Sequence, residues 1–401
     1  MPSSFAWLDY SEQERRRALD VISLFKQPET RDELGLGSIR DALADRFSPG
    51  TMTMQTRAKY FLLVPWMYQY FEQRRVESRK LDLLSRQFEI RLIDILADSA
   101  DSGGTIGIES RKALQRMPSS LYWAGLGRLG IRVFPGSQSQ YHRSLDGFHS
   151  KGSQLRELPS DPGNRIEEPV NWHPHIPDAP EGFPDGVSLE LTTDEAEYLR
   201  DRIRAAGPGS LLAHLVELKR RWKSVDFSWK HPRLAQFPEP LVIEVNHARM
   251  FSEVLHGAAL LYNLMLAEKR KRDPWIVNSD ERFEEWAMRI DSMAKEVKKW
   301  DRDGFWHLVD SQQAKIPLPT RRFVNAWLDL ATANSKTRGI KTDRKARSLI
   351  TQRETRLKKG RARLQNKRRL ELWQGGSGAA QLDFRWKITE DIALDILRAL
   401  A

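Results

Sequence analysis

A block of positive charge near the C-terminus limits what this chain can fold into. Between Lys336 and Arg369 the sequence holds fifteen Lys or Arg residues and only two acids, a local net charge of +13. The whole 401-residue chain carries +11, so the other 367 residues together are close to −2. A segment this rich in like charge repels itself unless a polyanion neutralises it. Nucleic acid is the commonest polyanion in a cell, so the block predicts nucleic-acid binding.

Composition and length indicate a folded chain with more than one core. The sequence is 40% hydrophobic, has 13 Trp residues and is 30% charged, which is typical of globular proteins. Single cores stop growing near roughly 250–300 residues, so a chain of 401 predicts two lobes in addition to the basic segment. The absence of cysteine excludes disulfides, thiolate metal sites and cysteine nucleophiles, and it fits a reducing cytoplasm.

The sequence has no pattern typical of a membrane anchor or an export signal. Its longest strongly apolar stretch, residues 60–70, is about half of the roughly 20 residues that a membrane span needs, and Pro65 interrupts it. The first residues lack the charged start, the apolar centre and the cleavage site of a signal peptide. We therefore expect a cytoplasmic protein that does not bind membranes.

Helical patterns predict a mainly α fold that begins with an N-terminal helical lobe, residues 1–136. Ser11 and Glu14 form a capping box ahead of an apolar periodicity, which predicts the first helix. Residues 60–71 are apolar around most of the helical circumference. A helix with this pattern is buried on all sides, so we expect it at the centre of the lobe.

A second lobe is expected over residues 187–335. It opens with a short predicted strand at 187–191, and several amphipathic helices follow in quick succession. The helix at 241–271 has a broad apolar face, which is suited to the middle of a helical bundle. Residues 137–186 are rich in Pro and Gly and poor in periodicity, so they predict a linker between the lobes.

Part of the N-terminal lobe resembles a winged helix-turn-helix. Residues 108–115 predict a short helix, Met117 and Pro118 a turn, and Ser119 the cap of a second short helix that precedes a strand at 131–134. The residues available for contacts with a DNA backbone are Arg111, Lys112, Arg116, Arg128 and Arg132. Plain packing of two short helices is the alternative, because glycines weaken the second helix.

The basic segment predicts a long helix over residues 336–373. Ile350, Leu357 and Leu364 recur every seven residues, which gives a narrow apolar seam with Arg and Lys in the other directions. Most of this range would span on the order of 46 Å at about 1.5 Å per residue. Such a helix could track phosphates, bridge two lobes or seat an acidic partner protein. After it, residues 374–401 predict a flexible glycine joint, a short strand at 382–388 and a final helix.

Nine basic side chains of this segment are the predicted nucleic-acid contacts. They are Lys345, Arg347, Arg356, Lys358, Lys359, Arg361, Arg363, Lys367 and Arg368. A second cluster of polar residues near the start of the chain predicts either an anion site or a structural ion-pair network. Its members are Arg31, Asp32, Arg40, Asp41 and Arg57.

The sequence offers no clear catalytic constellation. Asp185, Glu217 and Lys219 have the residue types of a metal-dependent nuclease, but helical patterns stand where that fold requires strands. The chain has no phosphate-binding Gly-x-x-x-x-Gly-Lys loop. Two alternatives stay open for other motifs: His173 and His175 as metal ligands or as surface loop, and residues 375–378 as a phosphate cradle or as a flexible joint. We expect no catalytic residue, no metal and no cofactor.

Several short motifs resemble those of an uncharacterised bacterial family, domain of unknown function 6361. They are FAWLDYS at 5–11, TRDELG at 30–35, QTRA at 55–58, VPW at 64–66 and QLDFRW at 381–386. The resemblance spans essentially the whole chain but supplies no catalytic residues. It implies a place in bacterial defence islands, close to genes for helicase-like and phospholipase-D-like nuclease proteins.

These observations give three hypotheses. The first is a non-enzymatic subunit of a bacterial anti-phage system that binds nucleic acid, with DNA favoured over RNA, through residues 336–369. The second is a scaffold that docks a helicase or a nuclease through the same basic arm. The third is a nuclease of unfamiliar type.

Overall fold

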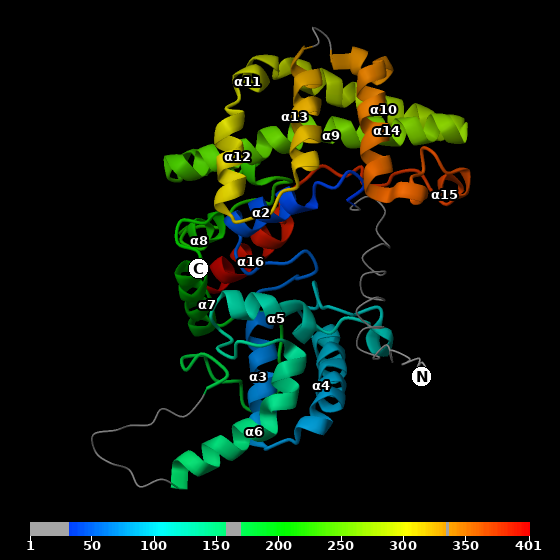
Figure 1. Ribbon diagram of the computed structural model, residues 1–401. Coiled ribbons are helices and arrows are strands. Elements are labelled where there is room, and N and C mark those ends of the chain that lie inside the picture. Colours follow the sequence, from blue (N-terminus) through cyan, green and yellow to red (C-terminus); the bar gives the residue numbers. More distant parts are fainter. Residues whose placement is uncertain (1–31, 158–169, 334–336) are drawn as a thin grey trace, which may run out of the picture. The chain divides into compact units, whose positions relative to one another are not determined.

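The computed structural model describes residues 32–157, 170–333 and 337–401, with side chains up to residue 150 in the first range. This part of the chain is mainly α-helical, as the sequence predicts (Figure 1). It forms two compact units, each assembled from two stretches of chain. Unit 1 joins Ser228–Phe384 to the described residues of Met1–Leu43, and unit 2 joins Arg385–Ala401 to Ala44–Phe227. Helix α2 (Gly37–Phe47) contains the point at which the chain passes from unit 1 to unit 2.

The units differ from the continuous lobes expected from sequence. Residues 187–227, expected in the second lobe, belong to unit 2 together with the C-terminal helix. Apolar periodicity shows which face of a helix is buried, but it does not show which other helix covers that face. The pairing of distant stretches is therefore information that only the structure supplies.

Unit 2 is built around α3, which the sequence predicts as a central helix. From Tyr60 to Tyr68 every residue of α3 is buried, because this part of the helix carries large apolar or aromatic side chains on all sides. The elements of unit 2 are α3 (Tyr60–Gln73), α4 (Ser78–Asp98), η3 (Arg111–Ala113), α5 (Pro118–Arg128), α6 (Gln138–Glu157), α7 (Thr193–Ala206), α8 (Leu211–Leu215) and α16 (Trp386–Ala399).

A half-buried carboxylate fixes the segment after residue 170 against α3. Glu72 accepts hydrogen bonds from Tyr141 Oη at 2.6 Å, Asn171 Nδ2 at 2.8 Å and Trp172 Nε1 at 3.1 Å. Burial raises the pKa of Glu72, and these three neutral donors offset only part of that rise. The Trp172 ring also stacks on Tyr68, with 5.7 Å between centroids.

Unit 1 is a helical bundle centred on α9. Helix α10 runs beside α9, and α13 and α14 pack across it (Figure 1). The elements are η4 (Ser228–Lys230), η5 (Leu234–Gln236), α9 (Glu239–Arg270), α10 (Asp273–Ser292), α11 (Ala294–Lys299), α12 (Arg302–Ser311), α13 (Leu318–Ala333), η6 (Thr337–Thr342), α14 (Arg344–Lys358), η7 (Lys359–Arg361) and α15 (Lys367–Glu371). The most apolar window of α9 is long enough to cross a membrane, but 89% of it is buried inside the protein, as in the core helix of a bundle.

The close contact of α9 and α10 depends on one glycine. The indole ring of Trp286 on α10 lies directly against Gly257 on α9, where a Cβ atom would collide with it. The indole N–H donates to the carbonyl of Glu253 at 2.8 Å, which fixes the ring in this position. A side chain at position 257 would therefore push the two helices apart.

Two predictions for the middle of the chain are wrong. The range 137–186, predicted as a linker, contains the twenty-residue helix α6. Among its residues up to Ser150 only Tyr141 and Leu145 are buried apolar ones, so its apolar pattern is too weak to identify a helix. The strand predicted at 187–191 is irregular, because this segment packs Val187 and Leu189 inward without pairing with a neighbouring strand.

The strand predicted at 382–388 is also wrong. Phe384 and Arg385 have φ angles of 54° and 62°, in the left-handed region that a strand cannot contain. Helix α16 then begins at Trp386, whose indole donates to Val225 O at 2.8 Å. The alternation of apolar and charged residues here reflects a tight turn with Phe384 and Trp386 both buried.

Candidate nucleic-acid interface

The basic segment is a folded-back chain and not the long helix that the sequence predicts. Helix α14 starts at Asp343, which caps it by accepting from Lys345 N and Ala346 N, and it ends at Lys358. Lys359 then takes a φ of 50°. The buried carboxylate of Glu354 accepts from the backbone N–H groups of Arg363 at 2.8 Å and Leu364 at 2.9 Å. These bonds draw the chain back onto α14, which a continuous helix would not allow.

The predicted apolar seam is interrupted at the same place. Ile350 and Leu364 are buried, but Leu357, between them in the heptad pattern, is 42% exposed. The side chains at 350 and 364 reach the core because the chain reverses between them. They do not form one stripe along a straight helix.

Five basic side chains of the segment are neutralised by acids of unit 1. The pairs are Arg338 with Glu284, Lys341 with Asp280 and Glu284, Arg347 with Glu268, Lys358 with Glu33, and Arg363 with Glu33. A sixth residue, Arg353, is buried and donates to the carbonyls of Leu34 at 2.7 Å and Gly35 at 3.1 Å. These contacts hold the segment to the bundle and engage the charges internally, although the side chain of Arg338 is 53% exposed.

Glu33 is the most deeply buried of these acids. It forms ion pairs with Lys358 and with Arg363, the latter at 2.7 Å, and it also accepts from the hydroxyl of Ser377. Burial alone would raise the pKa of Glu33, but the charges of Lys358 and Arg363 outweigh this effect and lower it. Glu33 is therefore a carboxylate that stays ionised inside the protein.

Eight other basic side chains are exposed and have no ion pair with any residue that the structure describes. They are Arg344, Lys345, Arg356, Lys359, Arg361, Lys367, Arg368 and Arg369, named here the exposed cationic set. Six of the nine predicted contacts belong to this set, and the other three, Arg347, Lys358 and Arg363, are paired internally. Eight positive charges without an ion pair in the described structure thus remain exposed within 26 residues of sequence.

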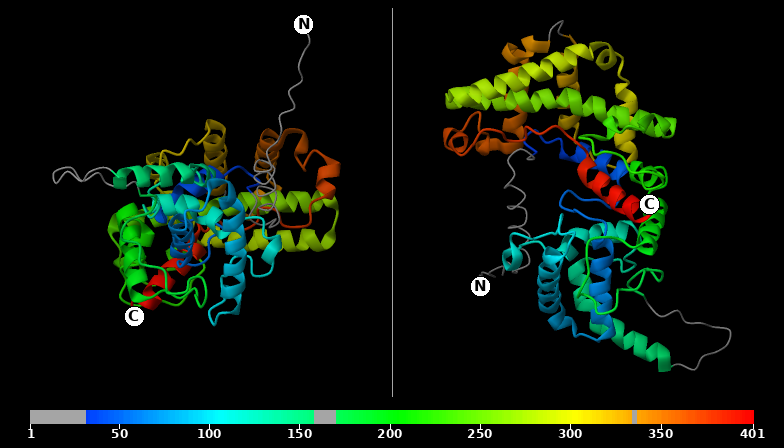
Figure 2. Two further views of the ribbon diagram at one scale, coloured as in Figure 1. Left: turned by 90° about the horizontal axis from the view of Figure 1, so that it is seen from below. Right: turned by 180° about the vertical axis from the view of Figure 1, so that it is seen from behind.

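The structure adds basic residues that the sequence analysis did not include. Lys269, Lys271 and Arg272 are exposed where α9 turns into α10. Lys269 Nζ donates to Leu364 O, and the ring of Trp275 lies 5.1 Å from that of Trp373, just after α15. The turn therefore lies beside α15, as Figure 1 and the right-hand view of Figure 2 show from opposite sides. The run KRKR at 269–272 was the sequence signal that could have identified it.

A groove runs between α13 and α14 on the same unit. It has a volume of about 580 Å³, and its lining combines apolar side chains, including Phe323 and Leu349, with Arg322 and Arg356. Arg356 also belongs to the exposed cationic set. The groove is thus an apolar surface bordered by positive charge.

The described members of the second predicted cluster make structural contacts. Arg31 lies outside the described residues, and Asp32 caps α2 by accepting from Leu36 N at 2.7 Å and Gly37 N at 2.8 Å. Arg40 pairs with Asp41, its neighbour in sequence, at 3.1 Å. Each of these contacts is local and structural.

Arg57, the last member of that cluster, lies in a buried ion-pair network in unit 2. Its guanidinium contacts Asp395 at 2.8 Å and Asp101 at 2.6 Å and donates to Gly103 O at 2.7 Å. Hydrogen bonds from Arg57 lower the pKa of Asp101, whereas burial raises that of Asp395. The N–H donors of Arg57 are thus engaged by Asp395, Asp101 and Gly103 O, which leaves few donors for a bound anion.

The predicted winged helix-turn-helix is not confirmed. Of its first helix only the single turn η3 forms, and at 131–134 there is one isolated bridge, between Arg132 and Trp172. At the start of α5, Ser119 is buried and donates to Glu89, while the buried Tyr122 donates to Arg57 O. Side chains that a recognition helix would present to DNA are used for packing.

The acids weighed as nuclease candidates pair with arginines, and the rings of His173 and His175 lie side by side, with 5.5 Å between their centroids. Asp185 pairs with Arg91 at 2.6 Å, and Glu217 pairs with Arg204 at 3.2 Å. His173 Nε2 lies 2.6 Å from the guanidinium of Arg202. Within the described ranges no three His, Asp or Glu side chains gather in a way that could hold a metal ion.

Comparison with known proteins gives one match. The model of the family described as "Family of unknown function (DUF6361)" matches residues 2–398, nearly the whole chain. No curated protein and no solved structure matches the sequence or the fold.

Proposed function

The chain belongs to the DUF6361 family, whose function is unknown, and from its surface charge we propose that it is a non-catalytic, nucleic-acid-binding subunit. The exposed cationic set would hold the phosphate backbone, with DNA as the proposed ligand. Catalysis in this proposal belongs to a partner, a helicase or a phospholipase-D-like nuclease. The setting, a bacterial anti-phage system in the cytoplasm, is the one that the family resemblance implies.

One observation carries the proposal: the fold separates the basic segment into paired and unpaired side chains. Acids of unit 1 neutralise Arg347, Lys358 and Arg363, which are half-buried. The eight members of the exposed cationic set keep their charge within 26 residues of sequence, from Arg344 to Arg369. Like charges at this density repel one another, and phosphates relieve that repulsion while releasing their own counterions.

A comparison of two triple variants tests the proposal. R361E/K367E/R368E reverses three charges of the exposed cationic set, and K295E/K298E/K299E reverses three exposed charges on α11, at the other end of unit 1 (Figure 1). Fluorescence anisotropy with labelled duplex DNA should show a loss of affinity of more than about tenfold for the first variant only. Equal losses in the two variants, or no binding by the wild type, would refute the proposal. Single-stranded DNA and RNA probes of the same sequence identify the preferred ligand.

The groove between α13 and α14 favours a second candidate function, a scaffold. Its apolar residues Phe323 and Leu349 next to Arg322 and Arg356 suit an amphipathic helix with acidic flanks. The variant L349D should then abolish co-purification of the helicase or nuclease partner after nuclease treatment and leave DNA affinity unchanged. Retention of the partner by L349D would exclude the groove as the docking site.

A further inference from the structure

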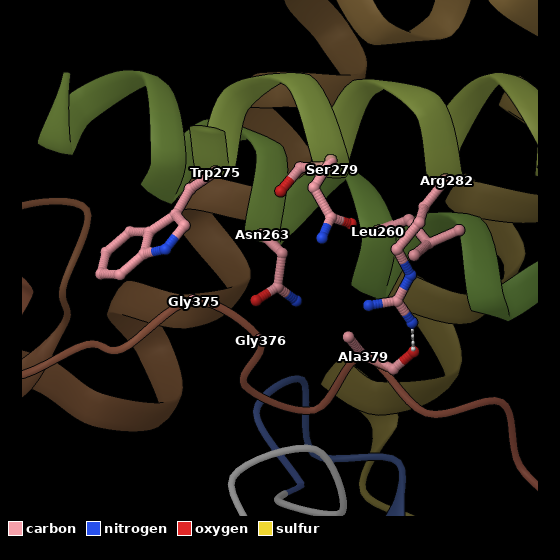
Figure 3. Close-up of a pocket in the computed structure, with 9 residues that line it drawn as sticks. Leu260, Asn263, Trp275, Ser279, Arg282, Gly375, Gly376 and Ala379 are labelled. Carbon is pink, nitrogen blue, oxygen red and sulfur yellow. Dashed lines mark hydrogen bonds between the residues drawn. The ribbon is translucent and has the colours of Figure 1, made fainter. Parts of the chain in front are cut away.

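A small polar pocket lies between α9, α10 and the glycine run that follows α15. It has a volume of about 100 Å³. Asn263 from α9 lies above Gly375 and Gly376, and Arg282 from α10 reaches down beside it, above Ala379 (Figure 3). This is far below the roughly 300 Å³ at which pockets for whole small molecules begin, so it has room for one chemical group.

The charged group in this pocket is a guanidinium without an acid. Arg282 Nη2 donates to Ala379 O at 3.1 Å, and no carboxylate in the described part of the chain pairs with Arg282. Arg282 is the one charged residue of the lining. The lining residues Asn278 and Ser279 make no side-chain hydrogen bond with any described residue, so their donors are available to a ligand.

The glycine run is held in place and is not a loose joint. Asn263 donates to Ser377 O at 2.9 Å and accepts from Ser377 N at 2.8 Å. Gly375 and Gly376 have φ angles of 94° and 156°, which residues with a side chain rarely adopt. Their N–H groups have no acceptor among the described residues. Consecutive backbone N–H groups without an internal acceptor are the kind of donor from which anion sites are built.

The pocket also adjoins the proposed nucleic-acid interface. Trp275 lines the pocket, and the guanidinium of Arg272 lies over its ring, 4.7 Å from the ring centroid. Arg272 belongs to the exposed turn beside α15. A strand held by the exposed cationic set would therefore have one of its ends within reach of the pocket.

We propose that this pocket binds a single terminal phosphoryl group through Arg282, Asn278, Ser279 and the amides of Gly375 and Gly376. The assignment to a strand end rests on the proposed function, because the phosphate would then belong to the bound nucleic acid. A phosphate inside a strand carries a sugar on both sides and would not fit a pocket of this size. A free pyrophosphate or nucleotide offers the same chemistry and is the other source of the group.

The test compares oligonucleotides that differ only at their ends. The wild type should bind a 5′- or 3′-phosphorylated strand about tenfold more tightly than the hydroxyl-ended strand at constant salt, as expected for charge-assisted hydrogen bonds. R282Q should abolish this preference and S279A should reduce it, with affinity for the hydroxyl-ended strand unchanged in both. R322Q removes an exposed charge from α13 and should keep the preference. Equal affinity of the wild type for phosphorylated and hydroxyl ends overturns the assignment to a strand end.

A calorimetric titration with pyrophosphate and with ATP shows whether the phosphoryl group comes from a strand end or from a free phosphate compound. It also distinguishes failure of the pocket proposal from failure of the proposed nucleic-acid-binding function. Saturable binding that R282Q abolishes, without any preference for phosphorylated ends, assigns the pocket to free phosphates. If the wild type binds no oligonucleotide, the proposed function fails, and the pocket is then judged by this titration alone. The pocket proposal is refuted if the wild type does not bind pyrophosphate or ATP and also shows no preference for phosphorylated over hydroxyl ends.

Discussion

The ammonium group of Lys358 forms an ion pair with the carboxylate of Glu33, 325 positions earlier in the chain. The next residue, Lys359, is exposed and has no such partner in the described structure. Neighbouring lysines thus have different roles, since one fixes the segment to the bundle and the other leaves its charge on the surface. This division decides which basic residues of the segment can reach a ligand.

Replacing Glu33 with Gln should destabilise the protein. The amide keeps the shape of the side chain but leaves the half-buried Arg363 without an acid, and it leaves Lys358 with Glu354 alone, at 3.5 Å. Removing one partner of a buried pair typically costs about 3 kcal/mol or more of unfolding free energy. Chemical denaturation of E33Q measures the loss, and K345Q, which removes an exposed charge, should match the wild type.

The effect of E33Q should also depend on pH. The pKa of Glu33 is lowered in the folded protein, so its stabilising contribution is present above the ordinary value of 4.5. It is lost as the pH falls through the lowered pKa. The difference between wild type and E33Q should therefore shrink in acid, and a constant difference down to that range would contradict the ion-pair account.

Glu89 should make stability fall as the pH rises through neutrality. Burial raises the pKa of Glu89 to about 7, and its hydrogen bonds from Ser119 offset only part of that shift. The contribution of protonated Glu89 to the free energy of unfolding is fully present below the ordinary pKa of 4.5. It is lost as the pH rises through about 7. E89Q, which is always neutral, should gain about 3 kcal/mol on the wild type between pH 4.5 and pH 8.5. Denaturation curves across this range would show no change in the difference if Glu89 titrated normally.

Alanine at two helical glycines should have opposite effects. At Gly257 a Cβ atom would meet the ring of Trp286, so G257A should cost about 1–3 kcal/mol through overpacking. At Gly147, inside α6, a Cβ atom would meet nothing within 4 Å, so G147A should gain about 0.5–1 kcal/mol from helix propensity. Thermal denaturation of both variants checks the signs. A stabilising G257A would show that α9 and α10 are less tightly packed than described.

The sequence predicted those parts of the fold that depend on local pattern. Helices α3 and α9 have apolar residues on nearly every side, and this property is visible without knowing what surrounds them. Helix α6 was missed because, up to Ser150, the apolar side chains that it buries are those of Tyr141 and Leu145 alone. The end of α14 was missed because Glu354 binds the N–H groups of residues 9 and 10 positions later, beyond the reach of helical periodicity.

The positive charge of the candidate interface was predictable from the sequence. Which basic residues are exposed there, and which pair with internal acids, was not. The density of Lys and Arg indicated an exposed segment, and eight of its side chains are exposed. Which residues are neutralised depends on acids remote in sequence, such as Glu33 and Glu268. No spacing rule connects these acids to the basic segment, so their pairing could come only from the folded chain.

The salt dependence of DNA binding tests the central claim most directly. The logarithm of the binding constant should fall linearly with the logarithm of salt concentration, and each lost phosphate contact should reduce the slope by about 0.9. The variant R361Q/K367Q/R368Q should therefore lower the magnitude of the slope by about 2.7, whereas K295Q/K298Q/K299Q should leave it unchanged. An identical slope for the wild type and both variants would contradict the claim that the exposed cationic set holds phosphates.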